Sequence, residues 1–339
     1  MDEGTSMRVA VFETEEWEHA ACLSLEREHT LVCTREPLND ATVAQYGDAE
    51  IVSPFVGSRL EASVLARLPS LKMIATRSTG YDHIDLEYCR SHRVTVSNVP
   101  NYGGPTVAEH VFALLLALSR HLVEAVERTR RGVFTQAGLR GFDLKGRRLG
   151  VIGTGRIGRR VIEIAKGFGM DVVAFDLQPG HTAADGLGFR YADFKTVLAE
   201  ADIVTLHVPA SPDGAHLISD AEFGAMKDGA VLINTARGSI VDVAALVRAL
   251  KSGKLRGAGL DVLPQEPLLK DEAEIFRSER YSEPELRTVL ASNVLLQFPN
   301  VLVTPHNAYN TEDAVGRIIA TTLDNIKGFA HGAAQNVIV

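Results

Sequence analysis

Short runs of apolar residues alternate with longer amphipathic stretches along most of this chain. In the first part of the chain, the runs that are typical of strands cover residues 7–13, 30–33, 50–55, 72–77 and 94–98. A second series covers residues 148–152, 171–176, 202–208, 230–236, 257–262 and 300–306. Because strands that alternate with helices favour parallel sheets covered on both faces, we predict an α/β protein with two doubly wound parallel sheets.

The stretches between these runs include one that is nearly all apolar, at residues 111–118. This run is far shorter than a membrane span, so we predict a buried helix. Thr106, with Glu109 three residues later, has the pattern of a capping box and predicts the start of this helix. The last helix is predicted at residues 311–328. The charged, irregular segment 264–299 is interpreted as an insertion with short helices that would serve as a lid or as the arm of a dimer.

Length and charge narrow the class of protein. A chain of 339 residues suits two domains, and its hydrophobic share of 45% and charged share of 23% are typical of globular proteins. The formal net charge of −8 argues against a nucleic-acid surface, which needs a basic patch. Cys22, Cys33 and Cys89 lack CxxC spacing, so we expect free thiols and a cytoplasmic location. We predict neither a signal peptide nor a membrane segment, because the sequence has no suitable apolar span.

A glycine-rich turn follows the first strand of the second series. Gly153, Thr154, Gly155, Arg156, Ile157 and Gly158 form a GxGxxG motif between a predicted strand and a predicted helix, and Asp176 ends the next strand. The glycines permit a tight turn and close approach to a pyrophosphate, and the helix N-terminus offers N–H groups to the phosphates. The Asp176 carboxylate would bind ribose hydroxyls and repel a 2′-phosphate, so we predict NAD rather than NADP. The equivalent turn of the first series, residues 12–15, has two carboxylates and no glycine, which makes it a poor phosphate site.

Three polar residues, Arg237, Glu266 and His306, lie at or shortly after the ends of predicted strands in the second series. The carboxyl ends of parallel strands line the ligand crevice of such sheets, so these side chains would converge. A histidine exchanges protons near neutral pH, a carboxylate can hold its tautomer, and an arginine can bind a carboxylate and polarise the carbonyl beside it. The set therefore suits hydride transfer at C2 of a small 2-oxo or 2-hydroxy acid. No metal site is predicted.

Each of these features also has a simpler explanation when it is taken alone. His306 would more often be structural, and Arg237 or Glu266 would be a member of a surface ion pair. A glycine-rich turn with an acidic residue downstream also arises by chance. The joint placement of the three residues after strand ends, beside a complete dinucleotide-binding pattern, favours the catalytic interpretation.

The chain resembles the family of D-isomer-specific 2-hydroxyacid dehydrogenases. The resemblance extends through most of the chain in the order of the family, and it is carried by STGYDHIDL (78–86), NVPNYGGPTVAEHVFALLLALSR (98–120), LGVIGTGRIGRRV (149–161), LHVPASPDGAHLI (206–218), LINTARGSIVDVAAL (232–246), GLDVLPQEP (259–267) and NVLVTPHNAYNTEDA (300–314). It implies the D configuration at C2 of the substrate.

The resemblance also implies roles for residues at matching positions. His306 would be the acid/base, paired with Glu266, and Arg237 would anchor the substrate carboxylate and C2 oxygen. Backbone N–H groups of Thr79, Gly80 and Tyr81 would bind the same carboxylate. The residues that would contact the cofactor besides the glycine loop and Asp176 are Val208 and Pro209 on the adenine side, Thr235 and Ala236 near the nicotinamide, Asp261 at the carboxamide, and His207, Arg237 and His306.

The family layout implies two Rossmann-like domains. Residues 1–101 and 307–339 would form a flavodoxin-like substrate domain, and residues 102–306 would form the NAD-binding domain. The two domains would close over the substrate about a hinge. The family also implies a homodimer whose contact involves residues 106–145.

The sequence indicates less about the part of the substrate that lies beyond C2. Tyr102 and Tyr309 resemble aromatic positions near the substrate methyl group of D-lactate dehydrogenases, although both side chains could simply pack. Pyruvate and D-lactate are the first prediction, and reduction of glyoxylate or hydroxypyruvate is the nearest rival. An alternative of another class is an NADH-sensing, corepressor-like binding protein on the same fold.

Overall fold

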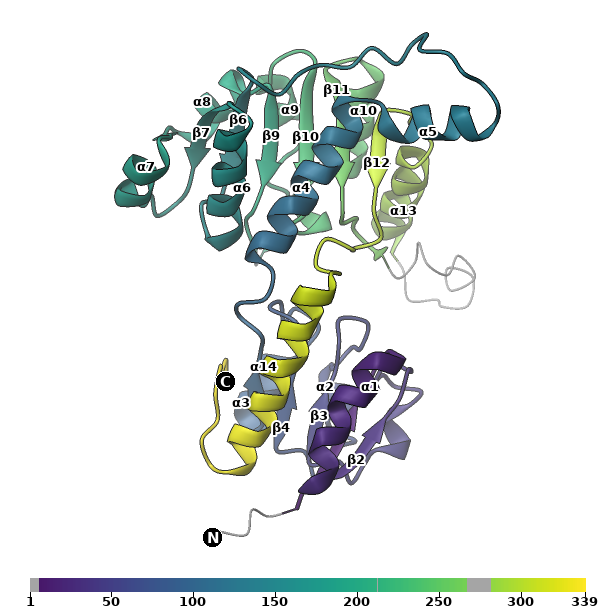
Figure 1. Cartoon of the computed structure of the whole chain (residues 1–339). Helices are drawn as coiled ribbons and strands as arrows, with labels where there is room; N and C mark the ends of the chain where they lie inside the picture. Colours follow the sequence, from purple (N-terminus) through teal and green to yellow (C-terminus); the bar gives the residue numbers. More distant parts are fainter. Residues whose placement is uncertain (1–5, 212, 267–281) are drawn as a thin grey trace. The chain divides into compact units, whose positions relative to one another are not determined.

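The computed structural model describes residues 6–211, 213–266 and 282–339. The chain divides into two compact units, the first formed by Met1–Tyr102 together with Thr311–Val339 and the second by Gly103–Asn310. The sequence analysis placed the two boundaries between the domains after residues 101 and 306. The two units divide after Tyr102 and Asn310. Each unit has its own sheet and its own core, and each is described by itself (Figure 1).

The first unit is built on a five-stranded parallel sheet. Its strands are β1 (Arg8–Val11), β2 (Thr30–Cys33), β3 (Ile51–Ser53), β4 (Met73–Ala75) and β5 (Thr95–Ser97). Their order in the sheet is β2-β1-β3-β4-β5, the flavodoxin-like arrangement. Its helices are α1 (Glu16–Cys22), α2 (Ala62–Leu65), α3 (Leu86–His92) and α14 (Glu312–Ala330), with the short 3₁₀ turns η1 (Leu23–Arg27) and η2 (Val43–Gln45).

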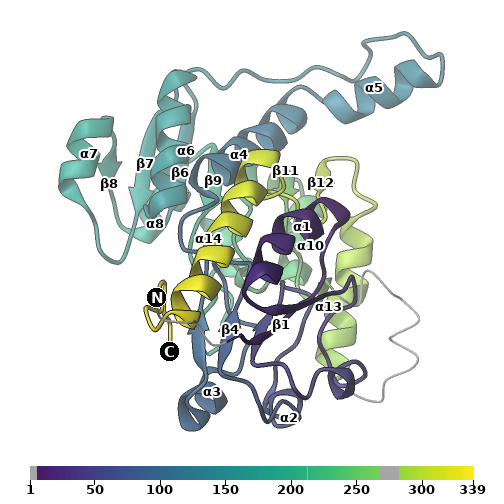
Figure 2. The same cartoon turned by 60° about the horizontal axis from the view of Figure 1, so that its bottom comes forward.

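Successive residues of these strands supply two separate cores. Val9 and Val11 of β1 join one cluster of buried side chains, whereas Ala10 and Phe12 join the other. Side chains alternate between the two faces of a strand, so a strand buried on both faces must be apolar throughout. Helices α1 and α14 pack together and cover one face, and α2 and α3 contribute to the cluster on the other (Figure 2).

The second unit is built on a seven-stranded parallel sheet. Its strands are β6 (Arg148–Ile152), β7 (Asp171–Phe175), β8 (Arg190–Tyr191), β9 (Ile203–Leu206), β10 (Ala230–Asn234), β11 (Leu255–Leu260) and β12 (Val301–Val303). The order β12-β11-β10-β9-β6-β7-β8 changes direction between β6 and β9, which is the switch point of a Rossmann fold. Both sheets are parallel, which confirms the predicted α/β class.

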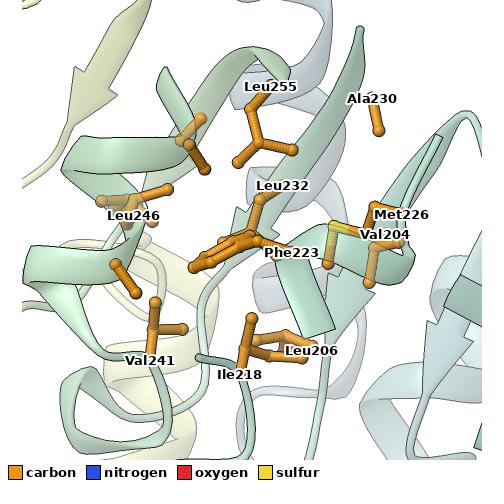
Figure 3. Close-up of a cluster of buried hydrophobic side chains, with 14 of the residues drawn as sticks. Val204, Leu206, Ile218, Phe223, Met226, Ala230, Leu232, Val241, Leu246 and Leu255 are labelled. Atoms are coloured by element: carbon orange, nitrogen blue, oxygen red, sulfur yellow. The ribbon is translucent and has the colours of Figure 1, made fainter. Parts of the chain in front are cut away.

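Helices cover both faces of this second sheet. They are α4 (Gly104–Ser119), α5 (Leu122–Arg130), α6 (Arg156–Gly167), α7 (His181–Leu187), α8 (Phe194–Glu200), α9 (Asp220–Ala225), α10 (Val243–Lys251) and α13 (Glu283–Leu295), with a 3₁₀ turn η3 (Gly238–Ile240). Helices α4 and α6 share one core with alternate residues of the sheet, and α8, α9 and α10 share the other. Figure 3 shows this second core, where Leu232 of β10 meets Phe223 of α9 and Leu246 of α10.

The structure corrects the sequence prediction in three places. Helix α4 begins at Gly104 after Gly103, so Thr106 is not its N-cap but a buried residue of the helix. Pro105 explains the earlier start, because a proline fits the first turn of a helix, where its missing N–H costs nothing. The two-residue strand β8 was missed, since so short a run has no periodicity to detect. Within the segment 264–299, residues 282–299 contain the 13-residue helix α13, and residues 267–281 lie outside the described part of the chain.

The long apolar helix is part of the core. Eight residues of α4 are buried, and the helix packs on α6, β10 and β11. Among the described residues, no single helix meets the length and hydropathy of a membrane span. Helices α4 and α5 meet them only as a pair, across a bend of 62°.

Candidate active site

Three neighbouring strands bring the predicted catalytic residues to one edge of the second sheet. Strands β10, β11 and β12 are parallel neighbours, and Arg237, Glu266 and His306 follow their carboxyl ends. The glycine loop follows β6 at the same edge, because all seven strands run in one direction. The fold thus assembles residues from widely separated parts of the sequence.

His306 and Glu266 form a direct pair. The Nδ1 atom of His306 lies 3.0 Å from Oε2 of Glu266, and their side chains are 37% and 28% exposed. The other carboxylate oxygen of Glu266 accepts a hydrogen bond from the Leu263 N–H at 3.1 Å. Because Glu266 occupies Nδ1, the nitrogen left to face a ligand is Nε2.

The backbone of His306 adopts an unusual conformation. Its φ is +54°, in the left-handed region that costs a residue with a Cβ about 1–2 kcal/mol. The His306 N–H donates to the carbonyl oxygens of Asp261 and Thr304, at 2.9 Å each. The surrounding hydrogen bonds therefore hold the ring in place against a local preference for another conformation.

Asp261 is a buried carboxylate at the end of β11, with 1% of its surface exposed. Thr304 Oγ1 donates to its Oδ1 at 2.6 Å, the Asn307 N–H donates to the same oxygen at 2.7 Å, and the Ala308 N–H donates to Oδ2 at 2.9 Å. Burial acts to raise the pKa of Asp261, but the nearby His110 ring and the hydrogen bonds from Thr304 and the two amides outweigh it and lower the pKa below its ordinary value. Asp261 is therefore ionised and supports the loop that carries His306.

Arg237 is placed by its neighbours in the chain. The side-chain amide of buried Asn234 donates to the Arg237 carbonyl at 2.9 Å and accepts from the Ala236 N–H at 3.0 Å. A Cβ on Gly238 would lie 2.1 Å from the Leu263 carbonyl carbon, so only glycine lets this loop contact the loop that leads to Glu266. The sequence analysis did not single out Asn234 or Gly238, although both stand in the matched segment around Arg237.

The glycine loop has the geometry that a dinucleotide requires. Gly153 has φ of +94°, and a Cβ there would lie 2.5 Å from the His207 carbonyl oxygen. A Cβ on Gly158 would lie 2.0 Å from the Gly153 oxygen, whereas a Cβ on Gly155 would meet nothing within 4 Å. The N–H groups of Gly155 and Ile157 have no acceptor among the described residues. Open space and unpaired N–H groups at the start of α6 fit a pyrophosphate.

Asp176 lies where the ribose of a bound dinucleotide is expected, and Thr154 orients it. Asp176 Oδ2 accepts from the Thr154 N–H at 2.7 Å and from its hydroxyl at 2.9 Å. Burial opposes ionisation, but hydrogen bonds from Gln178 and Thr154 lower the pKa of Asp176. The Tyr191 hydroxyl lies 2.8 Å from that of Thr154. Tyr191 was missed because it stands on β8, the strand that the sequence did not reveal.

The other predicted cofactor residues follow β9 and β10. His207 begins the segment after β9, with its N–H bonded to the Ile152 carbonyl at 2.8 Å, and burial lowers the pKa of its ring to about 3. The ring is therefore neutral at the edge of the glycine loop. Val208 is half-buried and Pro209 is exposed. Thr235 and Ala236 follow β10, and the Thr235 hydroxyl is buried without a hydrogen-bond partner in the described structure.

The predicted substrate residues Thr79, Gly80 and Tyr81 lie in the first unit, in the loop after β4. Thr79 Oγ1 donates to the Val99 carbonyl at 2.6 Å, and the Asn98 side chain donates to the Thr79 carbonyl at 2.8 Å. The three N–H groups at 79–81 find no acceptor in the parts of the chain that the structure describes. Such a row of free amides suits an anion such as a carboxylate.

The two tyrosines fall in different units. The Tyr102 carbonyl, in the first unit, accepts two hydrogen bonds from Arg317, and Tyr309 is a half-buried residue of the second unit. The structure therefore brings Glu266 and His306 together and places Arg237 and the glycine loop at the same edge.

Comparison with known proteins gives a consistent picture. Residues 112–308, more than half of the chain, match the family model described as "D-isomer specific 2-hydroxyacid dehydrogenase, NAD binding domain". D-lactate dehydrogenase of Escherichia coli is 35% identical over 87% of this chain and 88% of its own length, and glycerate dehydrogenase of Methylorubrum extorquens is 37% identical over 82% of each.

A solved structure matches the whole architecture. D-lactate dehydrogenase from Aquifex aeolicus, in complex with NAD and lactic acid, is 34% identical, covers 96% of both chains and superimposes with a TM-score of 0.85. Nothing in these comparisons supports the corepressor-like alternative. The chain therefore belongs to the family of D-isomer-specific 2-hydroxyacid dehydrogenases and is an NAD-dependent oxidoreductase acting on 2-hydroxy acids.

Proposed function

We propose that His306, Glu266 and Arg237 are the catalytic residues of this dehydrogenase and that it interconverts pyruvate and D-lactate. The observation that carries the proposal is the 3.0 Å contact between His306 and Glu266 at the sheet edge that also bears the glycine loop. A histidine held by a carboxylate, beside a dinucleotide loop and an arginine, is the arrangement that reduction of a 2-oxo acid requires.

The residues at this edge fit NAD. The amides of Gly155 and Ile157 would hold the pyrophosphate, and Asp176 would bind the ribose hydroxyls and repel the extra phosphate of NADP. The buried hydroxyl of Thr235 lacks a partner within the described residues, which suits a polar group of the cofactor there. Asp261 would act mainly by organising its loop, because both of its oxygens already accept hydrogen bonds.

The chemistry then divides among a few groups. Bound NADH supplies the hydride for C2. His306 Nε2 would give its proton to the C2 oxygen, while Glu266 stabilises the charged ring. Arg237 would bind the substrate carboxylate and polarise the C2 carbonyl, and the amides of Thr79 and its two neighbours would bind the same carboxylate. In the reverse direction His306 would accept the proton.

The choice of pyruvate rests on Tyr102 and Tyr309 and on the relatives. We propose for both residues the role that the resemblance implies, which is recognition of the substrate methyl group. Support comes from the named D-lactate dehydrogenases of Escherichia coli and Aquifex aeolicus. The second candidate is hydroxypyruvate or glyoxylate. It is favoured by the glycerate dehydrogenase of Methylorubrum extorquens, which is 37% identical to this chain.

A panel of acids tests the substrate. We expect NADH oxidation with pyruvate to have a higher kcat/KM than with glyoxylate, hydroxypyruvate, 2-oxobutyrate, phenylpyruvate or oxaloacetate, and we expect NADPH to be a poor substitute for NADH. Replacement of Tyr309 by Ala should lower kcat/KM for pyruvate more than for glyoxylate, which has no methyl group. A preference for hydroxypyruvate would replace the first candidate by the second.

Replacement of the acid/base residue tests the mechanism. His306→Gln should lower kcat for pyruvate reduction by about 100-fold or more while NADH still binds, because no group remains to supply the proton. Glu266→Gln should also lower kcat, since the protonated ring loses its anionic partner. Stopped-flow absorbance at 340 nm measures both. Wild-type turnover of His306→Gln would remove this residue from its role.

Two glycine substitutions separate cofactor binding from stability. Gly155→Ala should weaken NADH binding without changing the melting temperature, because its Cβ points into open space that a pyrophosphate would occupy. Gly158→Ala should also cost about 1–3 kcal/mol of unfolding free energy, because its Cβ meets the Gly153 oxygen at 2.0 Å. NADH fluorescence titration and thermal unfolding provide the two measurements. Unchanged NADH affinity of Gly155→Ala would contradict the proposed location of the cofactor.

We also propose that the protein is a cytoplasmic homodimer. The three cysteines are free thiols, as expected in a reducing compartment. No residue of α5 is buried, and Leu122, Val126 and Phe134 are 54%, 40% and 92% exposed. In both overall views α5 lies at the periphery of its unit (Figures 1 and 2). A second copy of the chain would cover these apolar side chains.

Light scattering tests the assembly. The wild type should have twice the chain mass of 36.7 kDa, and Val126→Asp should shift it toward one chain mass. Leu290→Asp is the matched control, because Leu290 is also an exposed apolar residue, 65% accessible, but lies on α13. A wild-type mass of one chain, or an equal effect of both substitutions, would contradict the proposed interface.

A further inference from the structure

His110 of α4 connects to the loop of His306 through a chain of hydrogen bonds. Its Nε2 lies 3.0 Å from the Thr304 hydroxyl oxygen and 3.4 Å from Oδ1 of Asp261. The His110 side chain is 18% exposed and that of Asp261 is 1% exposed, so the contact is shielded from water. None of the catalytic roles proposed above uses His110.

The direction of these hydrogen bonds follows from counting protons. Asp261 is ionised and can only accept, so the 2.6 Å contact from Thr304 uses the single hydroxyl proton of Thr304. The Thr304 oxygen must then accept from His110. The proton of the His110 ring therefore lies on Nε2, and the chain runs from His110 through Thr304 to Asp261.

Asp261 in turn holds the three consecutive N–H groups that surround the catalytic ring. The His306 N–H donates to its backbone carbonyl, and those of Asn307 and Ala308 donate to its carboxylate. These bonds fix His306 in its left-handed conformation, with φ of +54°. A rotation of the Asp261 side chain would release two of the three anchors and let the ring leave Glu266.

We propose that His110 is a positioning residue for the proton-transfer step. It holds Thr304 and, through it, the carboxylate that shapes the loop of His306. The inference rests on the proposed role of His306 as acid/base. The competing explanation is that His110 only stabilises the packing of α4, in which case its loss would lower stability but would leave turnover of the folded enzyme unchanged.

Two substitutions at His110 distinguish these explanations. His110→Leu fills a similar space but donates no hydrogen bond, and we expect kcat for pyruvate reduction to fall about tenfold, equivalent to about 1.4 kcal/mol. NADH affinity should stay within about twofold, because the glycine loop and Asp176 are unaffected. His110→Gln places an amide N–H near the position of Nε2 and should recover most of the lost kcat. Single-turnover measurements at a temperature well below the melting point separate rate from stability.

Thr304 offers a second route to the same chain. Thr304→Val removes the hydroxyl, whereas Thr304→Ser keeps it and serves as the control. If His110 acts through Thr304, the double variant His110→Leu/Thr304→Val should be about as slow as the slower single variant, not slower by the product of the two effects. If the double variant folds poorly, the comparison of Thr304→Val with Thr304→Ser still tests the chain, because only serine keeps the hydroxyl.

The results of these experiments distinguish a failure of this inference from a failure of the proposed function. A fully active His306→Gln would overturn the role of His306 itself. An inactive His306→Gln with wild-type kcat in His110→Leu would leave that role intact and overturn the positioning role of His110. Multiplicative losses in the double variant, or a glutamine variant as slow as the leucine variant, would also overturn it. A parallel loss of NADH affinity would show a general disturbance of the unit and would overturn it as well.

Discussion

A buried carboxylate must be matched by hydrogen-bond donors, and the active edge of the second unit is organised around this requirement. Asp261 sits at the end of β11 with almost no exposed surface, and its donors come from the loop after β12. Each donor that satisfies the charge also fixes a piece of backbone. The hydrogen bonds that stabilise the buried anion therefore also fix the conformation of the loop that carries His306.

The parallel direction of the strands places the other residues of the candidate site at one edge of the sheet. Three residues that are far apart in the sequence follow adjacent strands and lie at one edge of the sheet, and the glycine loop lies at the same edge beside the switch point. Close backbone contacts then set the finer distances. Gly238, for example, allows the loop of Arg237 to lie directly on the residues that lead to Glu266.

Much of this could be read from the sequence, because buried parallel strands are apolar throughout and the GxGxxG motif with Asp176 is a local pattern. The residues proposed to be catalytic could be picked out from the sequence because they follow the ends of predicted strands. Features that depend on how elements rotate against each other were not predictable. The contact of His110 with Thr304 requires a particular face of α4 to meet the end of β12. The start of α4 was misplaced because Pro105 outweighs the capping pattern at Thr106.

The turn between β1 and α1 in the first unit contains the carboxylate of Glu13. Both oxygens of the Glu13 carboxylate accept hydrogen bonds from the chain: the N–H groups of Phe55, Gly57 and Ser58 and the Ser58 hydroxyl all donate to them. The Glu13 carboxylate thus ties the turn after β1 to the loop that follows β3, and three amides of that loop are already paired with an anion that belongs to the chain. In the second unit the space beside Gly155 is open, so the two similar sheets differ in whether the turn after the first strand leaves room for an anion.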